Sequence, residues 1–340
     1  MQPWGSYQAE FSSCARGTIK YQSSQAEFGS GILKPTRLTQ LSGAVCLDEI
    51  PSVPNAPVWS HAGVMPQPLS ETPAAGLGDK VYLAGGYRTG IRSVRDFSQY
   101  SISTNTWIEL PNLPNARDHA MATEFEGQIF VFGGNQSDAN DTNPGWRFDP
   151  QLNSWTPLPA MVSGAASGSA RLGGKLYFGS AEGIIAELNP RTLISRTLPT
   201  EVRALRDHSQ LIAFQGELWL LGGRGQSGET RLVSIFDPAS ETWRAGPPMR
   251  AARGGFAAAS DDKMLILTGG EVIYSGTRVV ASTEVIVAGS QSFAALPNLP
   301  VPVHGMGGVL RERTFIVLGG SKSAGIAVNG GEVQILRWAQ

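Results

Sequence analysis

A glycine doublet that recurs at a nearly constant interval constrains the fold of this chain more than any other feature. Five doublets follow one another along the sequence, and a degenerate copy lies between the second and the third. The copies are Gly85-Gly86, Gly133-Gly134, Ser180-Ala181, Gly222-Gly223, Gly269-Gly270 and Gly319-Gly320, with first positions 48, 47, 42, 47 and 50 residues apart. A period of this length indicates an array of equivalent supersecondary units.

A five-residue apolar strand is predicted before each doublet, with a hairpin turn in front of it. The strand carries an aromatic or branched residue at one fixed position, occupied in turn by Tyr82, Phe130, Tyr177, Trp219, Ile266 and Ile316. The turns are two-residue pairs such as Gly78-Asp79, which are typical of β-hairpins. Small residues further upstream, as in residues 256–259, suit an innermost strand, because several sheets crowd around one axis there.

A second turn and a tryptophan follow each doublet at a fixed distance. The turn has an aromatic-Asp-Pro pattern, read as Phe148-Asp149-Pro150, Phe236-Asp237-Pro238 and, in a weaker copy, Leu188-Asn189-Pro190. Seven residues past the first position of the turn stand Trp107, Trp155 and Trp243, with Ser195 and Phe293 as substitutes. These signals add two strands to each unit, so that we expect four strands per unit.

Together the doublet, the turn and the tryptophan resemble the kelch repeat of β-propellers over roughly residues 57–340. The resemblance implies an all-β fold, a six-bladed kelch-type β-propeller of the superfamily that includes the central domain of galactose oxidase. A four-stranded blade buries its faces against two neighbours, so the array is stable when it closes into a ring. We interpret the doublets as structural glycines and the tryptophans as packing between blades.

The last blade is expected to be completed by a strand from the N-terminal part of the chain. Residues 332–336 form the third strand of the sixth unit, and the tryptophan of its outer strand would fall beyond residue 340. Trp59 precedes Pro66 by seven residues, which is also the offset from Trp107 to Pro114. We therefore predict that residues near 57–62 close the ring and cover an otherwise open sheet edge.

The chain is expected to divide into a poorly patterned N-terminal tail, residues 1–52, and the propeller, residues 53–340. The tail matches no repeat and shows neither alternation nor helical periodicity. It is too short for the BTB-type dimerisation domain that accompanies many kelch propellers in ubiquitin-ligase adaptors, which weighs against an adaptor role.

Charge and hydropathy exclude two classes of partner. The formal charge of −1 and the pI near 6.4 argue against nucleic-acid binding, which needs a basic surface. No apolar run of 18 residues occurs, so we expect no membrane span.

The N-terminus lacks the basic-then-apolar order of a secretory signal, which favours a cytoplasmic protein over an exported one. A closed ring has few unpaired edges, so we expect a monomer.

Arginines gather at the expected mouth of the central channel. The repeat alignment places Arg117, Arg206 and Arg253 at one position, where the innermost strand begins. The first two open the triplets Arg117-Asp118-His119 and Arg206-Asp207-His208, and the loops after the doublets add Arg88, Arg92, Arg224 and Arg278. The guanidinium fork matches a carboxylate, sulfate or phosphate. The predicted ligand-binding residues are Arg117, His119, Arg206, His208, Arg253, Arg88 and Arg224.

A structural interpretation of the same residues stays open. An arginine at this position can pair with a carboxylate of a neighbouring blade, and Asp118 and Asp207 are available for that. The histidines can pack beside the channel. The third blade has a short loop after its degenerate doublet, which indicates either a gap in the rim or ordinary decay of the repeat.

Known chemistries of similar propellers narrow the functions further. Copper radical oxidases need a cysteine joined to a tyrosine, and Cys14 and Cys46 both precede the repeats, so we exclude that chemistry. Plant specifier proteins hold iron with spaced Glu, Asp and His, whereas Asp138 and Asp141 share a loop that has no neighbouring histidine. We therefore expect no metal and no cofactor, and we assign no catalytic residue.

The leading hypothesis is a recognition module that binds an anionic partner, either an acidic peptide or an acidic carbohydrate, at the channel mouth. The alternative is a sugar mutarotase or epimerase, similar to the bacterial kelch mutarotases that act on sialic acid. In that case arginine would hold the sugar carboxylate, and a histidine or aspartate would move a proton during ring opening.

Overall fold

The computed structural model describes residues 5–11, 17–24, 29–33, 56–136, 144–159, 164–179, 184–199 and 206–338. The chain divides into two compact units, Met1–Pro54 and Asn55–Gln340. The described residues of both units form β-strands, turns and irregular segments, and none of them forms a helix that could cross a membrane.

The first unit contains a small sheet that the sequence pattern did not predict. Strands β1 (Gly5–Phe11), β2 (Gly17–Ser23) and β3 (Ser30–Leu33) pair antiparallel in the order β1-β2-β3. Tyr7 is paired with Tyr21 in the register of β1 and β2. Ile32 and Leu33 on β3 are exposed.

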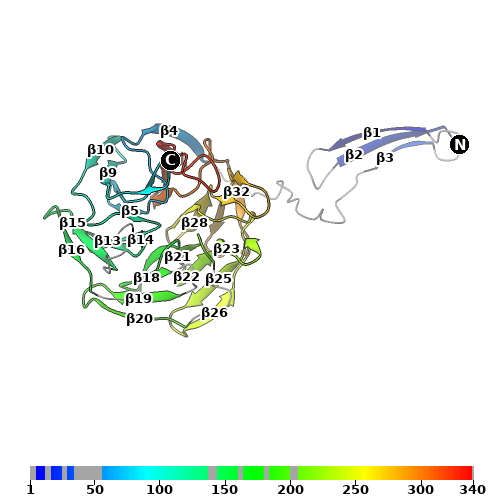
Figure 1. Ribbon diagram of the computed structural model, residues 1–340. Coiled ribbons are helices and arrows are strands. Elements are labelled where there is room, and N and C mark those ends of the chain that lie inside the picture. The colour runs from blue at the N-terminus through cyan, green and yellow to red at the C-terminus, as the bar shows by residue number, and fades with distance from the viewer. Residues whose placement is uncertain are drawn as a thin grey trace. The chain divides into compact units, whose positions relative to one another are not determined.

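The second unit is a six-bladed β-propeller, as the repeat predicted (Figure 1). Each blade is a four-stranded antiparallel sheet. In order from the innermost strand outward, the first three blades are β5 (Ala74–Leu77), β6 (Lys80–Ala84), β9 (Phe97–Ser101) and β10 (Thr106–Glu109); β12 (Met121–Phe125), β13 (Gln128–Phe132), β15 (Gly145–Asp149) and β16 (Ser154–Pro157); and β17 (Ser169–Leu172), β18 (Lys175–Gly179), β19 (Ile185–Asn189) and β20 (Ile194–Thr197).

The remaining three blades follow the same order. They are β21 (Gln210–Phe214), β22 (Glu217–Leu221), β25 (Val233–Asp237) and β26 (Thr242–Ala245); β27 (Ala257–Ser260), β28 (Met264–Thr268), β31 (Thr283–Val287) and β32 (Ala294–Leu296); and β33 (Gly307–Arg311), β34 (Thr314–Leu318), β35 (Glu332–Arg337) and β4 (Val58–Val64). Each innermost strand contacts the innermost strand of the next blade, and β33 contacts β5, so the circle is complete.

The predicted ring closure is confirmed. Strand β4 pairs antiparallel with β35 as the outer strand of the last blade, with Trp59 opposite Leu336 and Ser60 opposite Ile335. The N-terminal strand therefore covers the sheet edge that the last repeat leaves open.

Short two-stranded ribbons lie in the loops on one face of the propeller. They pair β7 (Tyr87–Arg88) with β8 (Arg92–Ser93), β11 (Arg117–Asp118) with β14 (Asn135–Gln136), β23 (Arg224–Gly225) with β24 (Gly228–Glu229), and β29 (Glu271–Val272) with β30 (Arg278–Val279). Isolated bridges, such as Ser70 with Tyr87 and Asp207 with Arg224, hold the loops after the doublets against the segments that precede the innermost strands. We call this side the loop face.

The core is divided among the interfaces between blades. Tyr82 and Phe97 of the first blade pack against Phe148 of the second, with the Phe97 and Phe148 ring centroids 4.8 Å apart. The indole Nε1 of Trp155 donates a 2.8 Å hydrogen bond to the carbonyl oxygen of Pro111 in the preceding blade. The interpretation of the repeat tryptophans as packing between blades is confirmed at these contacts.

The doublets end the second strand of each blade where another segment passes closely. Gly86 has a φ of 114°, and a Cβ at this position would lie 2.6 Å from the carbonyl oxygen of Ser70. A side chain is therefore excluded both by the backbone conformation and by the neighbouring backbone.

Candidate functional site

Six equivalent residues, one from each blade, form a ring of backbone around the propeller axis. Each stands fourteen positions before the first residue of a doublet, and each has a positive φ, between 48° and 64°. We call them the axial ring: Glu71, His119, Ala166, His208, Gly255 and Gly305. Backbone hydrogen bonds join consecutive members, from the amide of His119 to the carbonyl of Glu71 (3.1 Å) through to the amide of Gly305 and the carbonyl of Gly255 (2.7 Å).

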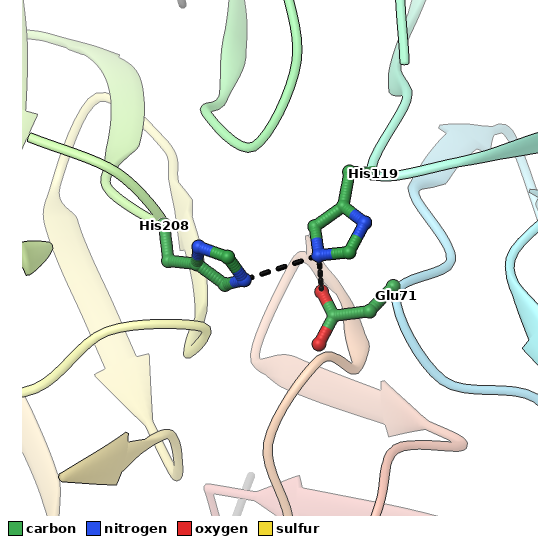
Figure 2. A group of neighbouring side chains, drawn as sticks. All are labelled: Glu71, His119 and His208. Atoms are coloured by element: carbon green, nitrogen blue, oxygen red, sulfur yellow. Dashed lines mark hydrogen bonds and ion pairs between the residues drawn. The ribbon is translucent and has the colours of Figure 1, made fainter. Parts of the chain in front are cut away.

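Three side chains of the axial ring meet near the axis (Figure 2). Nε2 of His119 lies 3.1 Å from Nε2 of His208 and 3.4 Å from Oε2 of Glu71. We call these three residues the axial triad. The other ring members are Ala166, Gly255 and Gly305, and their small size leaves the space that the triad fills.

A carboxylate orients each histidine of the axial triad. Nδ1 of His119 lies 2.5 Å from Oδ1 of Asp118, and Nδ1 of His208 lies 2.6 Å from Oδ1 of Asp207. Asp118 also accepts hydrogen bonds from Ser93 (2.5 Å) and from the side-chain amide of Asn135 (2.9 Å). In each Arg-Asp-His triplet the aspartate thus holds the Nδ1 side of the ring, and Nε2 points toward the axis.

Glu71 is held from its other side. Its Oε1 lies 3.4 Å from Nδ1 of His304, which is also 3.5 Å from Oε2 of Glu271. Nε2 of His304 donates a hydrogen bond to the carbonyl oxygen of Ser323 at 2.9 Å. The guanidinium of Arg224 binds Glu271 at 2.7 Å, so that charged side chains of several blades are linked beside the axis.

Burial and charge act in opposite directions on the pKa values of this group. Burial alone would raise the pKa of Glu71, but His119, His304 and His208 together lower it far below its usual value. Burial alone would lower the pKa of His119, but Glu71 and Asp118 raise it above the usual value. The pKa of His304 is raised in the same way by Glu71 and Glu271, against the effect of burial. The carboxylates therefore favour positive charge on the imidazoles of His119 and His304.

A cavity of about 460 Å³ extends along the axis from the axial triad to the hairpin turns. Its wall consists of the innermost strands, whose side chains are mostly small, as in Ala122, Ala170 and Gly308. Asp261, Asp262 and Arg311 lie among the lining residues at the hairpin end. The axial triad therefore borders a channel large enough for a small ligand.

The prediction that guanidinium groups line the channel mouth requires correction for three arginines. Each of them lies just before an innermost strand. Arg253 is fully buried and binds Glu284 at 2.6 Å, and Arg206 is buried with hydrogen bonds to the carbonyl of Leu232 (2.8 Å) and to Ser234 (3.0 Å). Arg117 is fully buried with its guanidinium 4.6 Å from the ring centroid of Trp146. These side chains turn into their own blades, because carbonyl, carboxylate and aromatic partners are available there.

The loop arginines divide into buried and exposed members. Arg224 is buried against Glu271 and Asp207, so it too departs from the expected rim. Arg278 is exposed and donates to carbonyl oxygens of its own loop. Arg88 is exposed and pairs with Asp96 at 2.7 Å.

Arg88 belongs to an exposed basic cluster in the loop of the first blade. Arg92 and Arg95 are also exposed, and within the described part of the chain their guanidinium groups have no ion-pair partner. With Ile91 and Asp96 these arginines line a cavity of about 620 Å³. We call Arg88, Arg92 and Arg95 the first-blade basic cluster.

Two sequence predictions lie outside the described residues. They concern the degenerate doublet of the third blade and the start of the short loop after it, residues 180–183, and the loop that carries Asp138 and Asp141. The ligand roles of Arg88, His119 and His208 remain predictions, now with defined surroundings.

Sequence reasoning missed Glu71, His304 and Arg95. A signal for Glu71 was present, because it occupies the same offset from its doublet as His119 and His208. No comparable sequence signal marks His304, which directly precedes Gly305 of the axial ring. Its approach to Glu71 depends on the closure of the sixth blade against the first.

Comparison with known proteins agrees with the repeat pattern. The family model described as "Kelch motif" matches residues 68–114 and 117–162. The chain is 29% identical to Kelch-like protein terF of Aspergillus terreus over 282 residues, which is 74% of this chain and 61% of that protein. It is 24% identical to Beta-scruin of Limulus polyphemus, over 67% of this chain and 22% of that protein. Human Kelch-like protein 23 is 25% identical, over 65% of this chain and 40% of that protein. The chain thus spans less than two thirds of the length of each of these relatives.

A solved structure has the same architecture. The structure described as "Structure of YjhT" superimposes with a TM-score of 0.66 and 16% sequence identity, covering 81% of this chain and 99% of that one. At this level of identity the similarity shows the fold alone.

Proposed function

The chain belongs to the kelch-repeat family of β-propellers, and on that premise we propose that its loop face binds an acidic segment of a partner protein. Kelch repeats generally mediate binding between proteins. The acidic character of the partner is our proposal, and it rests on the first-blade basic cluster.

The proposal of an acidic partner rests on the concentration of positive charge in one short loop. Among residues 87–96 three arginines are exposed, and Asp96 is the one acidic residue of this segment. Arg92 and Arg95 line the 620 Å³ cavity, where each could bind a partner carboxylate with two hydrogen bonds. A local cluster of this kind can attract an acidic segment even though the whole chain carries a formal charge of −1.

Exposed apolar residues on the same face favour a protein partner over a sugar. Ile91 is 55% exposed, and Tyr274 and Ile326 in the loops of the fifth and sixth blades are 70% and 51% exposed. Arginine and tyrosine are enriched among the residues that contribute most to binding at protein interfaces.

The alternative, a mutarotase acting on sialic acid, has weaker support. The arginines expected to hold the sugar carboxylate, Arg117 and Arg206, are buried in their blades. His119 and Glu71 border the channel and include groups that can transfer protons. Accelerated anomerisation of sialic acid by the intact chain would favour this alternative over the recognition module.

The proposal is tested by titrating the full-length chain with a library of acidic peptides. We expect Arg92→Ala and Arg95→Ala each to weaken the selected peptide by roughly 5- to 30-fold, because each removes about 1–2 kcal/mol of charged hydrogen bonding. Affinity should also fall with rising salt. Arg244→Ala is the control, since this exposed arginine lies on the outer strand β26 and pairs with Glu217 of β22. Equal affinity in the loop variants and the control would contradict the proposal.

A further inference from the structure

The axial triad has the residue types and the geometry of a metal-binding site. It combines two imidazoles and one carboxylate, one from each of three blades, whose ligand atoms all lie within 4.8 Å of one another. We propose that Glu71, His119 and His208 bind one divalent transition-metal ion on the propeller axis, a role separate from the partner binding proposed above.

Two of the three distances between the proposed ligand atoms fit coordination of one ion. Metal–ligand bonds of about 2.0–2.2 Å, with angles between about 90° and 110°, place neighbouring ligand atoms about 3.0–3.5 Å apart. Nε2 of His119 lies 3.1 Å from Nε2 of His208 and 3.4 Å from Oε2 of Glu71. These two pairs therefore already have the separation that coordination requires (Figure 2).

The contacts of the histidines turn both Nε2 atoms toward the axis. Nδ1 of His119 lies 2.5 Å from Oδ1 of Asp118, and Nδ1 of His208 lies 2.6 Å from Oδ1 of Asp207. The two Nε2 atoms then face each other across 3.1 Å, and a cation or a proton shared between them would offset the repulsion of their lone pairs. The nearby Oε2 of Glu71 adds negative charge, which strengthens the demand for a cation.

All three proposed ligands have a supporting partner in an outer shell. Asp118 and Asp207 hold the histidines in the carboxylate–histidine arrangement that is common around protein-bound metals. Nδ1 of His304 faces Oε1 of Glu71 at 3.4 Å, which leaves Oε2 for the ion. If the three side chains were close only by chance, there would be no reason for each of them to contact a further polar side chain on the side away from the axis.

The local balance of charge also favours a dication. The carboxylates of Glu71, Asp118, Asp207 and Glu271 surround the axis, and the guanidinium of Arg224 binds the last two. The remaining negative charge of these carboxylates can be balanced by a dication or by protons on the imidazoles. A shared proton is the competing occupant, and the two differ in whether added metal binds with a fixed stoichiometry.

The ligand set indicates the class of metal and leaves positions open. Imidazole and carboxylate ligands without thiolate suit zinc, iron(II), cobalt(II) or nickel(II). Three protein ligands leave at least one coordination position for water or a small ligand. The 460 Å³ channel borders the triad, so an oxygen of a small ligand could complete the coordination. This proposal differs from the sequence-based expectation of no metal. That expectation was based on residues that are close together in sequence, whereas the axial triad comes from three blades.

The test is titration of the full-length, chelator-treated chain with zinc chloride by calorimetry and with cobalt(II) by visible absorption. We expect one equivalent to bind with micromolar or tighter affinity, and the cobalt complex to show the spectrum of nitrogen and oxygen ligands. Glu71→Gln and His208→Ala should each weaken binding at least tenfold, and Asp207→Asn should weaken it by about 10- to 100-fold as an outer-shell change.

The controls address folding and non-specific binding. His61→Ala removes an exposed histidine of β4 and should leave the affinity unchanged. Alanine at position 208 is compatible with the ring, since Ala166 occupies the equivalent position with a φ of 54°. Glu71→Gln is nearly isosteric and provides the decision if His208→Ala does not fold. Absence of saturable binding, or binding that is equal in Glu71→Gln and the unaltered chain, would overturn the proposal, and titration of a shared proton without bound metal would do the same.

Discussion

The indole Nε1 of Trp59 donates a 2.8 Å hydrogen bond to the carbonyl oxygen of Pro297, although 238 residues separate the two in sequence. Trp155 makes the equivalent bond to Pro111, and Trp243 makes it to Pro199, each across 44 residues. Strand β4 is therefore equivalent to the outer strands of the other blades in its contact with the preceding blade as well as in its pairing with β35.

Removal of this strand should open the propeller. Deletion of residues 1–65 removes β4 and exposes the edge of β35 and the cores between adjacent blades. We expect the thermal midpoint to fall by on the order of 10 °C or more, because several kcal/mol of buried contacts are lost. Deletion of residues 1–52 retains β4 and is the matched control. Equal midpoints for the two truncated chains would show that the closing strand is dispensable.

The contribution of the Trp59 hydrogen bond to stability can be measured without deleting strand β4. Trp59→Phe keeps an aromatic ring but removes the indole donor, and we expect the free energy of unfolding to fall by about 0.5–1.5 kcal/mol. Trp155→Phe should cost a similar amount, since its bond to Pro111 has the same length. Urea denaturation of both variants provides the comparison. A cost confined to Trp155→Phe would mean that the closing contact contributes nothing.

The buried pair of Arg253 and Glu284 should behave as a structural element. Both side chains are almost inaccessible and lie 2.6 Å apart. Glu284→Gln leaves a buried guanidinium without its counter-ion, so we expect the free energy of unfolding to fall by about 3–5 kcal/mol. Urea denaturation measures this loss, and titration with the acidic peptide should show unchanged affinity in the folded variant. Weakened peptide binding with full stability would restore Arg253 to the ligand site.

The carboxylate of Glu187 should give the third blade a pH dependence. Burial alone would raise its pKa, but Arg196, Lys175 and Tyr177 donate hydrogen bonds that lower the pKa to about 2 from an ordinary value of 4.5. Because the pKa of the folded state lies below that of the unfolded state, the stabilisation is present above about pH 4.5 and is lost as the pH falls toward about 2.

Replacement of Glu187 should flatten this acid dependence. We expect Glu187→Gln to lower the free energy of unfolding at neutral pH by about 1–3 kcal/mol, with a smaller loss at about pH 2.5. Urea denaturation at several pH values measures the slope. Glu217→Gln is the control, because its partner Arg244 is exposed and surface pairs contribute little. The idea fails if both variants show the same slope as the unaltered chain.

Much of the candidate site could not be predicted from the sequence. The repeat alignment correctly grouped Arg117, Arg206 and Arg253, but their position alone did not show that each side chain turns into its own blade. Arg253 binds Glu284, 31 residues along the chain, and Arg206 binds Ser234, 28 residues along. Such partners become neighbours only when the third strand of the blade is in register with the second.

The axial triad illustrates the same limit. His119 and His208 were recognised as equivalent, but 89 residues separate them, and their contact requires two blades on opposite sides of the small Ala166. Glu71 joins them from the first blade. The aspartates of the two triplets were considered as partners of arginine, and Asp207 does contact Arg224, but the structure also places both aspartates against histidine Nδ1 atoms.

The sequence by itself determined the number of blades, the four-stranded plan and the source of the closing strand. These features are local or periodic, because each strand, turn and glycine doublet satisfies its own backbone requirements and the array repeats them. Only the tertiary structure decided which polar side chains are buried, which are exposed and which meet on the axis. The physical reason is that burial and charge pairing depend on neighbours from other strands and blades, which the chain brings together when the ring closes.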